Sequence, residues 1–130
     1  MISITIHRRD GQDNFARTNR PARISWRGRS VLVPRGFEFD GASIPRFFWR
    51  LICAPLSPEA ARAARDHDWV YRKQPAGWTR KDADLMFYCR LIEDGLAPWR
   101  AGLAYRGVRL FGWIAWTENA TGHAAEAAKK

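Results

Sequence analysis

Short runs of alternating hydrophobic and polar residues mark the N-terminal part of the chain, a pattern typical of half-buried strands. Isoleucines stand at positions 2, 4 and 6, so they share one face of a strand expected over residues 1–6. The polar stretch from Arg8 to Pro21 shows no such alternation and predicts a loop. The chain is therefore expected to begin with one strand and a long loop.

A second alternating region predicts a hairpin. The apolar segments 24–26 and 31–33 flank Arg27-Gly28-Arg29-Ser30, in which the glycine permits a tight turn. Residues 37–40 alternate phenylalanine with acidic residues. The first forty residues should therefore form a small antiparallel sheet, whose last strand leads into Asp40-Gly41-Ala42-Ser43-Ile44-Pro45.

The remaining sequence predicts helices, because apolar residues recur at spacings of three and four. Ser57-Pro58-Glu59 places a capping serine before a proline, which predicts the start of a helix that reaches Lys73. Thr79 with Asp82 three residues later resembles a capping box, and Gly95 is the expected end of that helix. Further helical segments are expected at 46–53 and at 98–116.

These elements predict an α+β fold with a small N-terminal antiparallel sheet followed by a three-helix subdomain. A chain of 130 residues suits one domain, expected over residues 1–118. The small and polar residues 119–130 predict a disordered tail. The connector 74–78 is short enough to fold the two helices beside it back as an antiparallel pair.

Polar residues on this helix pair form a candidate site. Ala60, Ala64, His67 and Tyr71 recur at spacings of four, three and four, which places His67 within the apolar stripe that faces the core. Asp84 lies at the corresponding inward position of the second helix, and a buried carboxylate is costly unless a donor satisfies it. We therefore expect Asp84 to accept a hydrogen bond from His67.

This pair predicts a general base. If one ring nitrogen of His67 bonds Asp84, the other can take a proton from water, and His67 would then act catalytically with Asp84 as its orienting acid. The expectation requires that the two side chains meet in a crevice that water can reach. The alternative is a purely structural pair that joins two helices.

Other residues leave further chemistry open. Ser43 with His67 and Asp84 supplies the residue types of a nucleophile, a base and an acid, but residues 40–45 equally suit a turn whose side chains bond the backbone. Asp68, at the edge of the same cleft, and Asp40 are candidate ligands for calcium or another divalent cation. Zinc is poorly served, because no second histidine accompanies His67.

The charge of the chain is strongly basic, with a formal net charge of +9 that is concentrated in the N-terminal half. Such a field attracts nucleic acid, anionic lipid or acidic polymers in general. No zinc-finger, RRM or helix-turn-helix pattern accompanies it, so nucleic acid is not the expected partner. Cys53 and Cys89 match no zinc or redox spacing and are expected to be buried thiols, although one disulfide stays open.

Membrane signals are weak. The longest uncharged run near the C-terminus, 110–117, is too short for a transmembrane helix, and the N-terminus lacks the pattern of a signal peptide. Seven tryptophans, several of them near arginines, suit packing in the core or against a protein partner better than lipid binding, with peripheral lipid contact as the alternative.

Three motifs of this chain resemble an uncharacterised family of small bacteriophage and prophage proteins, a domain of unknown function. They are Phe39-Asp40-Gly41-Ala42-Ser43-Ile44-Pro45, His67-Asp68-Trp69-Val70-Tyr71 with Ala83-Asp84, and Gly107-Val108-Arg109. The resemblance covers roughly residues 24–116. It implies a phage-associated context and no settled activity.

The helix-pair motif is also similar, more distantly, to calcium-dependent secreted phospholipases and to the viral capsid lipase domain. By that resemblance His67 would be the base, Asp68 a calcium ligand, Asp84 the orienting acid and Tyr71 a supporting hydrogen-bond donor. The chain departs from those enzymes in lacking a glycine-rich calcium loop shortly before the histidine and in lacking their disulfides.

Two functions follow as hypotheses. The first is a phage-associated hydrolase in which His67 activates water against an ester or amide of the cell envelope, with or without a divalent cation. The second is a virion or assembly protein of the tail or head, in which His67 and Asp84 only hold helices together. In either case the protein is expected in the cytoplasm during synthesis, and in the second it enters the virion with other phage proteins.

Overall fold

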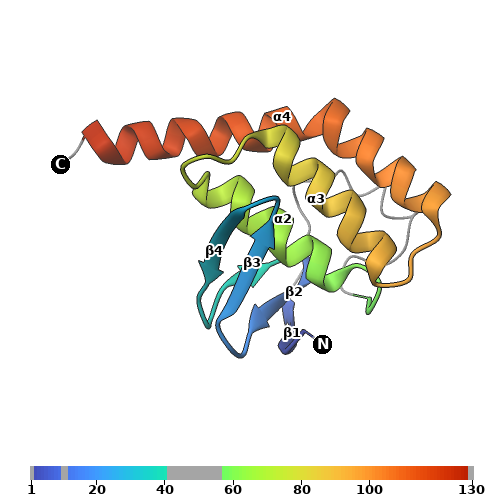
Figure 1. Ribbon diagram of the computed structural model, residues 1–130. Coiled ribbons are helices and arrows are strands. Elements are labelled where there is room, and N and C mark those ends of the chain that lie inside the picture. Colours follow the sequence, from blue (N-terminus) through green and yellow to red (C-terminus); the bar gives the residue numbers. More distant parts are fainter. Residues whose placement is uncertain (1, 10–11, 41–56, 129–130) are drawn as a thin grey trace.

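The computed structural model describes residues 2–9, 12–40 and 57–128 of the chain. Its strands come first and its helices follow, so the α+β prediction with a small antiparallel sheet and later helices is confirmed. In Figure 1 the helices lie together above the strands, with α4 crossing over α2 and α3. The expected helix at 46–53, Ser43 and Cys53 lie outside the described residues.

The first strands form a hairpin where a loop was expected. Strand β1 (Ile4–Arg9) pairs antiparallel with β2 (Gln12–Thr18). The prediction of a loop from Arg8 to Pro21 is therefore wrong. Its polar composition conceals an inward face, since Ala16 and Thr18 are buried while Arg17 between them is exposed.

The predicted second hairpin is confirmed. Strand β3 (Ala22–Trp26) pairs with β4 (Arg29–Val33) across the two-residue turn Arg27-Gly28. Both turn residues have positive φ, 45° and 79°, as a primed hairpin turn requires. Gly28 adopts a positive φ readily, and Arg27 adopts one because this turn requires it at both positions.

A short strand, β5 (Glu38–Phe39), completes a three-stranded sheet in the order β1-β2-β5, while β3 and β4 form a separate two-stranded sheet. Thr18 joins the two sheets at their seam. Its hydroxyl donates to the Pro34 carbonyl (2.9 Å) and accepts from the Phe37 amide (2.9 Å). This buried threonine explains how the chain passes from β4 to β5 without leaving backbone groups unsatisfied.

Helix α2 (Ala61–Lys73) begins later than the sequence predicts. Its N-cap residue is Ala60, which offers no side-chain cap, and the Ser57 carbonyl instead accepts from the amides of Ala60 (3.0 Å) and Ala61 (2.8 Å). Ser57 thus begins a tight turn that precedes the helix, and the predicted serine cap is wrong. The predicted end at Lys73 is confirmed, and Gln74 closes the helix in the left-handed conformation.

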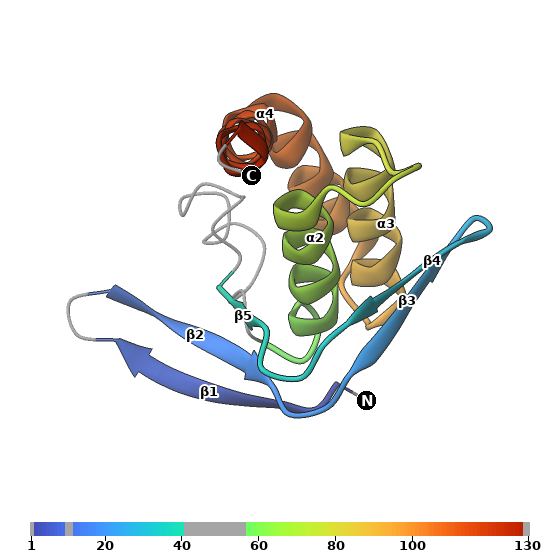
Figure 2. The same ribbon diagram turned by 90° about the vertical axis from the view of Figure 1, so that its left-hand side faces the viewer.

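Helix α3 (Arg80–Glu93) opens on the predicted capping box. The Thr79 hydroxyl accepts from the Asp82 amide (3.1 Å), and an Asp82 carboxylate oxygen accepts from the Thr79 amide (2.9 Å). Gly95 follows the helix with a φ of 105°, as expected of a stop signal. Figure 2 shows α2 and α3 side by side beneath α4, as the short connector 74–78 predicts.

Helix α4 (Pro98–Ala128) is much longer than the predicted segment 98–116. Residues 119–128, which belong to the expected disordered tail, continue the helix, and alanines supply good helix formers there. This last part projects beyond the other helices (Figure 1) and its side chains are mostly exposed. No helix among the described residues has the length and hydrophobicity needed to cross a bilayer.

Among the residues that the structure describes, the core divides into two clusters. One lies between the strands and the end of α2 and includes Phe37, Phe39, Val70, Tyr71 and Met86. The other lies among the helices at the start of α2 and α4, and its members are Ala60, Ala63, Phe87, Leu91, Leu96, Ala101, Ala104 and Val108. Small alanines on α2 and α4 let the helices approach closely. The candidate site lies where α2, α3 and α4 meet.

Candidate functional site

The predicted contact between His67 and Asp84 is present. His67 Nε2 lies 2.8 Å from Asp84 Oδ1, and the Tyr71 hydroxyl donates to the same oxygen at 2.6 Å. His67 and Tyr71 stand one turn apart on α2, so both reach the carboxylate that α3 carries. The sequence spacing therefore identified the His67–Asp84 contact correctly, and the bond from Tyr71 is the one that the resemblance to secreted phospholipases implied.

The other carboxylate oxygen is held by α4. Arg109 Nη1 donates to Asp84 Oδ2 at 2.7 Å, and Arg80 Nη1 lies 3.4 Å from the same oxygen. Arg80 also donates to the α4 carbonyls of Val108 (2.9 Å) and Arg109 (3.3 Å). Side chains from α2, α3 and α4 thus converge on one carboxylate. We call His67, Tyr71, Arg80, Asp84 and Arg109 the Asp84 cluster.

The cluster keeps Asp84 ionised. Burial by itself raises the pKa of Asp84, but the hydrogen bonds from His67, Tyr71 and Arg109 outweigh that effect and hold the pKa below its ordinary value. Burial and the neighbouring Asp84 charge raise the pKa of Tyr71, so its hydroxyl remains a donor. Because the acid is ionised, Nε2 of His67 must carry a hydrogen, which fixes how the ring is oriented.

The cluster is sealed from solvent at its centre. Asp84 is 0% exposed, and His67 and Tyr71 are each 1% exposed. The His67 ring packs against the rings of Tyr71 (centroids 4.1 Å apart) and Phe87 (4.8 Å). The expectation of a crevice that water can reach is therefore wrong for His67 in this conformation. The apolar stripe that carries the histidine inward also buries it.

The remaining predicted residues are not brought into the Asp84 cluster. Asp68 is 3% exposed on α2, and Asp40 follows β5 with a half-buried side chain. Among the residues that the structure describes, no three histidine, cysteine or acidic side chains form a group that could hold a metal ion. Ser43 lies outside that part of the chain, and the half-buried Cys89 is a free thiol. The calcium interpretation thus gains no geometric support from these residues.

Sequence reasoning missed both arginines of the cluster. Arg80 stands four residues before Asp84, a spacing at which opposite charges meet on a helix, so that contact could have been found. Arg109 comes from a segment 25 residues away, and only the packing of α4 reveals it. Arg109 belongs to the Gly107-Val108-Arg109 motif, for which the sequence predicts no role.

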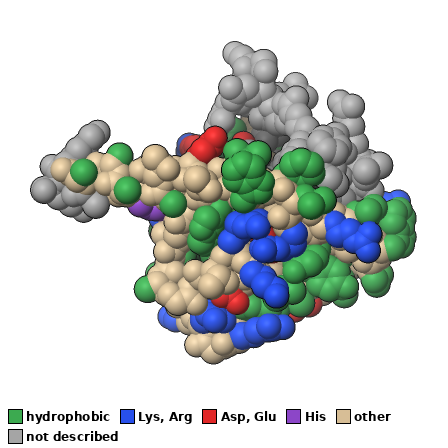
Figure 3. Space-filling view, turned by 90° about the horizontal axis from the view of Figure 1, so that it is seen from above, with side chains coloured by type: hydrophobic (Ala, Val, Ile, Leu, Met, Phe, Trp, Pro, Cys, Tyr) green, Lys and Arg blue, Asp and Glu red, His purple; other side chains and the backbone are tan. Residues whose placement is uncertain are grey.

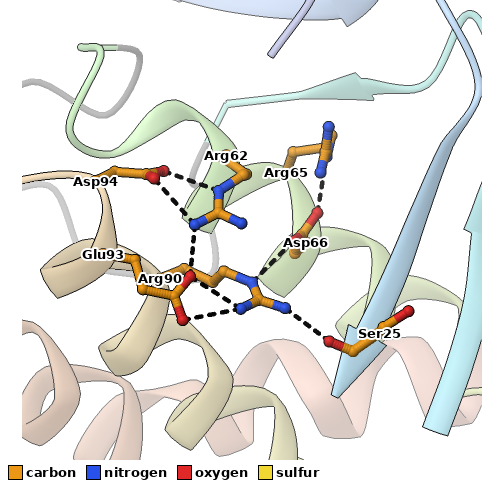
Figure 4. Close-up of polar contacts among 7 residues, drawn as sticks. All are labelled: Ser25, Arg62, Arg65, Asp66, Arg90, Glu93 and Asp94. Atoms are coloured by element: carbon orange, nitrogen blue, oxygen red, sulfur yellow. Dashed lines mark hydrogen bonds and ion pairs between the residues drawn. The ribbon is translucent and has the colours of Figure 1, made fainter. Parts of the chain in front are cut away.

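A second charge cluster, separate from the Asp84 cluster, links α2, α3 and β3 (Figure 4). Asp66 is 2% exposed and accepts from Arg65 Nε at 2.7 Å, with Arg90 Nε 3.7 Å from its other oxygen. Burial raises the pKa of Asp66 despite these two cations. Arg90 also donates to Glu93 (3.0 Å) and to the Ser25 carbonyl (2.7 Å), so it joins the helices to the hairpin β3–β4.

Arg62 closes the far end of this second cluster. Its Nε and Nη2 donate to the two carboxylate oxygens of Asp94 (2.9 Å each), and Nη2 also reaches Glu93 at 2.7 Å. The fork therefore ties the start of α2 to the end of α3. None of these residues converges on a histidine or a nucleophile, and the cluster serves as an electrostatic joint between elements.

Fold and site together define a small α+β domain whose helical subdomain is built around one buried, ionised carboxylate. The chain belongs to the DUF1353 family, described as a protein of unknown function, and it matches the family over residues 20–108. That range contains the two-stranded hairpin, β5, α2, α3 and the first part of α4. His67, Tyr71, Arg80 and Asp84 fall within it, whereas Arg109 is the first residue beyond it.

One curated protein is similar to part of this chain. The "Uncharacterized protein y4jT" of Sinorhizobium fredii (strain NBRC 101917 / NGR234) is 34% identical to this chain over 80 residues, which is 62% of this chain and 23% of that protein. The matched stretch is thus less than a quarter of the relative. No solved structure matches the chain.

Proposed function

We propose that this chain is a non-catalytic structural or assembly domain in which His67 and Asp84 hold the helices together. One observation carries the proposal: Asp84 is fully buried, and groups from α2, α3 and α4 occupy both of its oxygens. A buried charge that is paired on every side specifies how helices pack, and this role involves no catalytic reaction. The burial of His67 supports the same role.

The setting of this role is an assembly with other proteins. In y4jT the matching region makes up a minor part of a longer protein, which suits a domain that works next to others. The resemblance of the sequence motifs to phage and prophage proteins suggests the tail or head of a virion. The phage context rests on that resemblance alone.

Purified particles of the phage or prophage that encodes the chain provide the test. Quantitative mass spectrometry should find the protein at a fixed copy number per particle. His67→Gln should enter particles in proportion to the folded fraction measured by thermal unfolding. Absence of the protein from particles would contradict the assembly role.

A hydrolase is the second candidate, and a specific geometry favours it. Asp84 engages Nε2 of His67, so the hydrolase reaction would require proton transfer at Nδ1, and the Tyr71 hydroxyl donates to the same acid. This agrees with the roles that the distant resemblance to secreted phospholipases implies. Since His67 is 1% exposed, water would reach the ring only after the surrounding chain moves.

The hydrolase is tested with short-chain phosphatidylcholine and with a p-nitrophenyl ester, each with and without calcium. His67→Gln should abolish turnover while the melting temperature stays within a few degrees, and His7→Gln in β1 is the matched control. A calcium-dependent rise in melting temperature that Asp68→Asn removes would support a metal site. Turnover that His67→Gln leaves intact would exclude His67 as the base.

A further inference from the structure

Helix α4 carries a stripe of exposed hydrophobic side chains along one face. Trp99 is 63% exposed, Leu110 64%, Trp113 55% and Ile114 45%. With the half-buried Leu103 they stand at positions 99, 103, 110, 113 and 114, at intervals of four, seven and then three or four, so they align on one side of the helix. We call Trp99, Leu103, Leu110, Trp113 and Ile114 the α4 stripe.

The opposite face of α4 is the one that packs against the domain. Ala101, Ala104, Val108 and Gly112 are buried, and they recur at spacings of three and four on the other side of the helix. The α4 stripe therefore lies on the face of α4 that does not pack against the domain. From Trp99 to Ile114 the stripe spans about 22 Å, so it is an extended hydrophobic surface and not a set of scattered exposed residues.

The charge along this part of the helix has a single sign. Between Pro98 and Thr117 the sequence has three arginines, at 100, 106 and 109, and no acidic residue. Arg106 is exposed within the line of the stripe, and the Arg100 guanidinium lies 5.1 Å from the centre of the Trp99 ring. Seen from above α4, Figure 3 shows hydrophobic side chains next to Lys and Arg side chains, with few acidic ones between them.

We infer that the α4 stripe docks on an anionic lipid surface, with α4 lying in the plane of the interface. Tryptophan, leucine and isoleucine enter the boundary between headgroups and acyl chains, and Arg100 and Arg106 contact phosphates. The net charge of +9 strengthens this attraction over the whole molecule. The inference goes beyond the assembly role and does not depend on catalysis at His67.

A second copy of this chain is the poorer occupant. Two copies would bring net charges of +9 together, and Arg106 of each stripe would face further arginines with no acidic residue to pair them. An anionic bilayer supplies the complementary charge and accepts a convex helix without needing a matching groove. Charge complementarity therefore selects the lipid surface.

The test is co-sedimentation of the full chain with vesicles of phosphatidylcholine that contain roughly 30% phosphatidylglycerol. The assay is run at about physiological ionic strength. We expect clear binding to these vesicles and at least tenfold weaker binding to pure phosphatidylcholine. The double variant Leu110→Ser with Trp113→Ser should lower the partition coefficient at least tenfold. Arg100→Gln with Arg106→Gln should lower it with a reduced dependence on salt.

Leu32→Ser is the matched control, because Leu32 is an equally exposed leucine (56%) on β4, away from α4. It should bind vesicles like the unmodified chain, and circular dichroism should show that all variants are folded. Failure to bind anionic vesicles, or binding that the stripe variant retains, would overturn the inference. So would a dimer in analytical ultracentrifugation that the stripe variant converts to a monomer, since the stripe would then join two copies.

Discussion

Gly112 of α4 lies directly against the hydroxyl of Tyr71 on α2: a Cβ on residue 112 would stand 2.3 Å from Tyr71 Oη and 3.3 Å from Arg80 Nη1. The tyrosine is 1% exposed and its hydroxyl donates to Asp84, so its ring cannot easily move aside. This contact explains why a glycine, unfavourable within a helix, stands where α4 crosses the Asp84 cluster.

Gly112→Ala should therefore lower the free energy of unfolding by roughly 1–3 kcal/mol, as overpacking does elsewhere. The matched control is Gly102→Ala in the same helix, where an added Cβ meets nothing within 4 Å. That variant should gain up to about 1 kcal/mol from helix propensity alone. Chemical denaturation of both measures the difference, and equal effects would refute the contact with Tyr71.

Asp84→Asn should destabilise the protein by on the order of 3 kcal/mol at pH 7, because it removes the charge that Arg109 and His67 are paired with. The folded-state pKa of Asp84 is depressed, so its stabilisation is present above the unfolded pKa of about 3.9 and is lost as the pH falls through the folded pKa. The gap between variant and parent should thus narrow on acidification below about pH 4, as denaturation at several pH values will show.

The contribution of Asp66 to stability should depend on pH in the opposite direction. Burial raises its folded-state pKa, so any stabilisation linked to its titration is present below the unfolded pKa and lost as the pH rises through the folded pKa. Asp66→Asn should therefore cost less at pH 7 than Asp84→Asn, even though the two acids are similarly buried. If Asp66→Asn lost more stability than Asp84→Asn at pH 7, the attraction of Asp66 to Arg65 and Arg90 would outweigh the cost of burying its charge.

Arg109→Met keeps most of the side-chain stem and removes the donor that bonds Asp84. We expect a loss of roughly 2 kcal/mol, because a hydrogen bond to a buried charge is lost. Arg106→Met on the same helix, where the arginine is exposed, should stay within about 0.5 kcal/mol of the parent. Thermal unfolding of the pair would refute the assigned bond if the two variants melted together.

Thr79→Ala removes half of the capping box at the start of α3. It should lower stability by about 1 kcal/mol, whereas Thr79→Ser should restore most of that loss. Thr121→Ala serves as the control, since its hydroxyl bonds only the Thr117 carbonyl within exposed α4. Urea denaturation compares the three, and a silent Thr79→Ala would mean that tertiary packing alone positions α3.

Local signals in the sequence were sufficient for much of the fold. The capping box at Thr79, the turn at Arg27-Gly28 and the stop at Gly95 each rest on neighbouring residues, so they could be predicted. β2 could not, because the residues with described side chains that it buries are Ala16 and Thr18, and a small and a polar residue give no hydrophobic alternation. The extension of α4 to Ala128 was hidden in the same way by small and polar residues.

The candidate site was predictable only as far as one helix pair extends. Spacing along α2 and α3 brought His67 and Asp84 together correctly, since the connector between the helices is short, whereas the bond from Tyr71 to Asp84 was implied only by the resemblance to phospholipases. Spacing cannot report solvent access, and the aromatic groups around His67 seal it. Arg109 and Gly112 enter through the docking of α4, which no local pattern encodes.

The positions of Arg109 and Gly112 allow only one alignment of α4 on its neighbours. If α4 slid by one turn in either direction, Tyr105 or Trp113 would replace Arg109 opposite Asp84, and Val108 or Trp116 would press on Tyr71 in place of Gly112. Each shifted alignment removes the Arg109 bond to the buried Asp84 and forces a larger side chain into occupied space. A single acid and a single missing methyl group thus select the register in which this helix completes the protein.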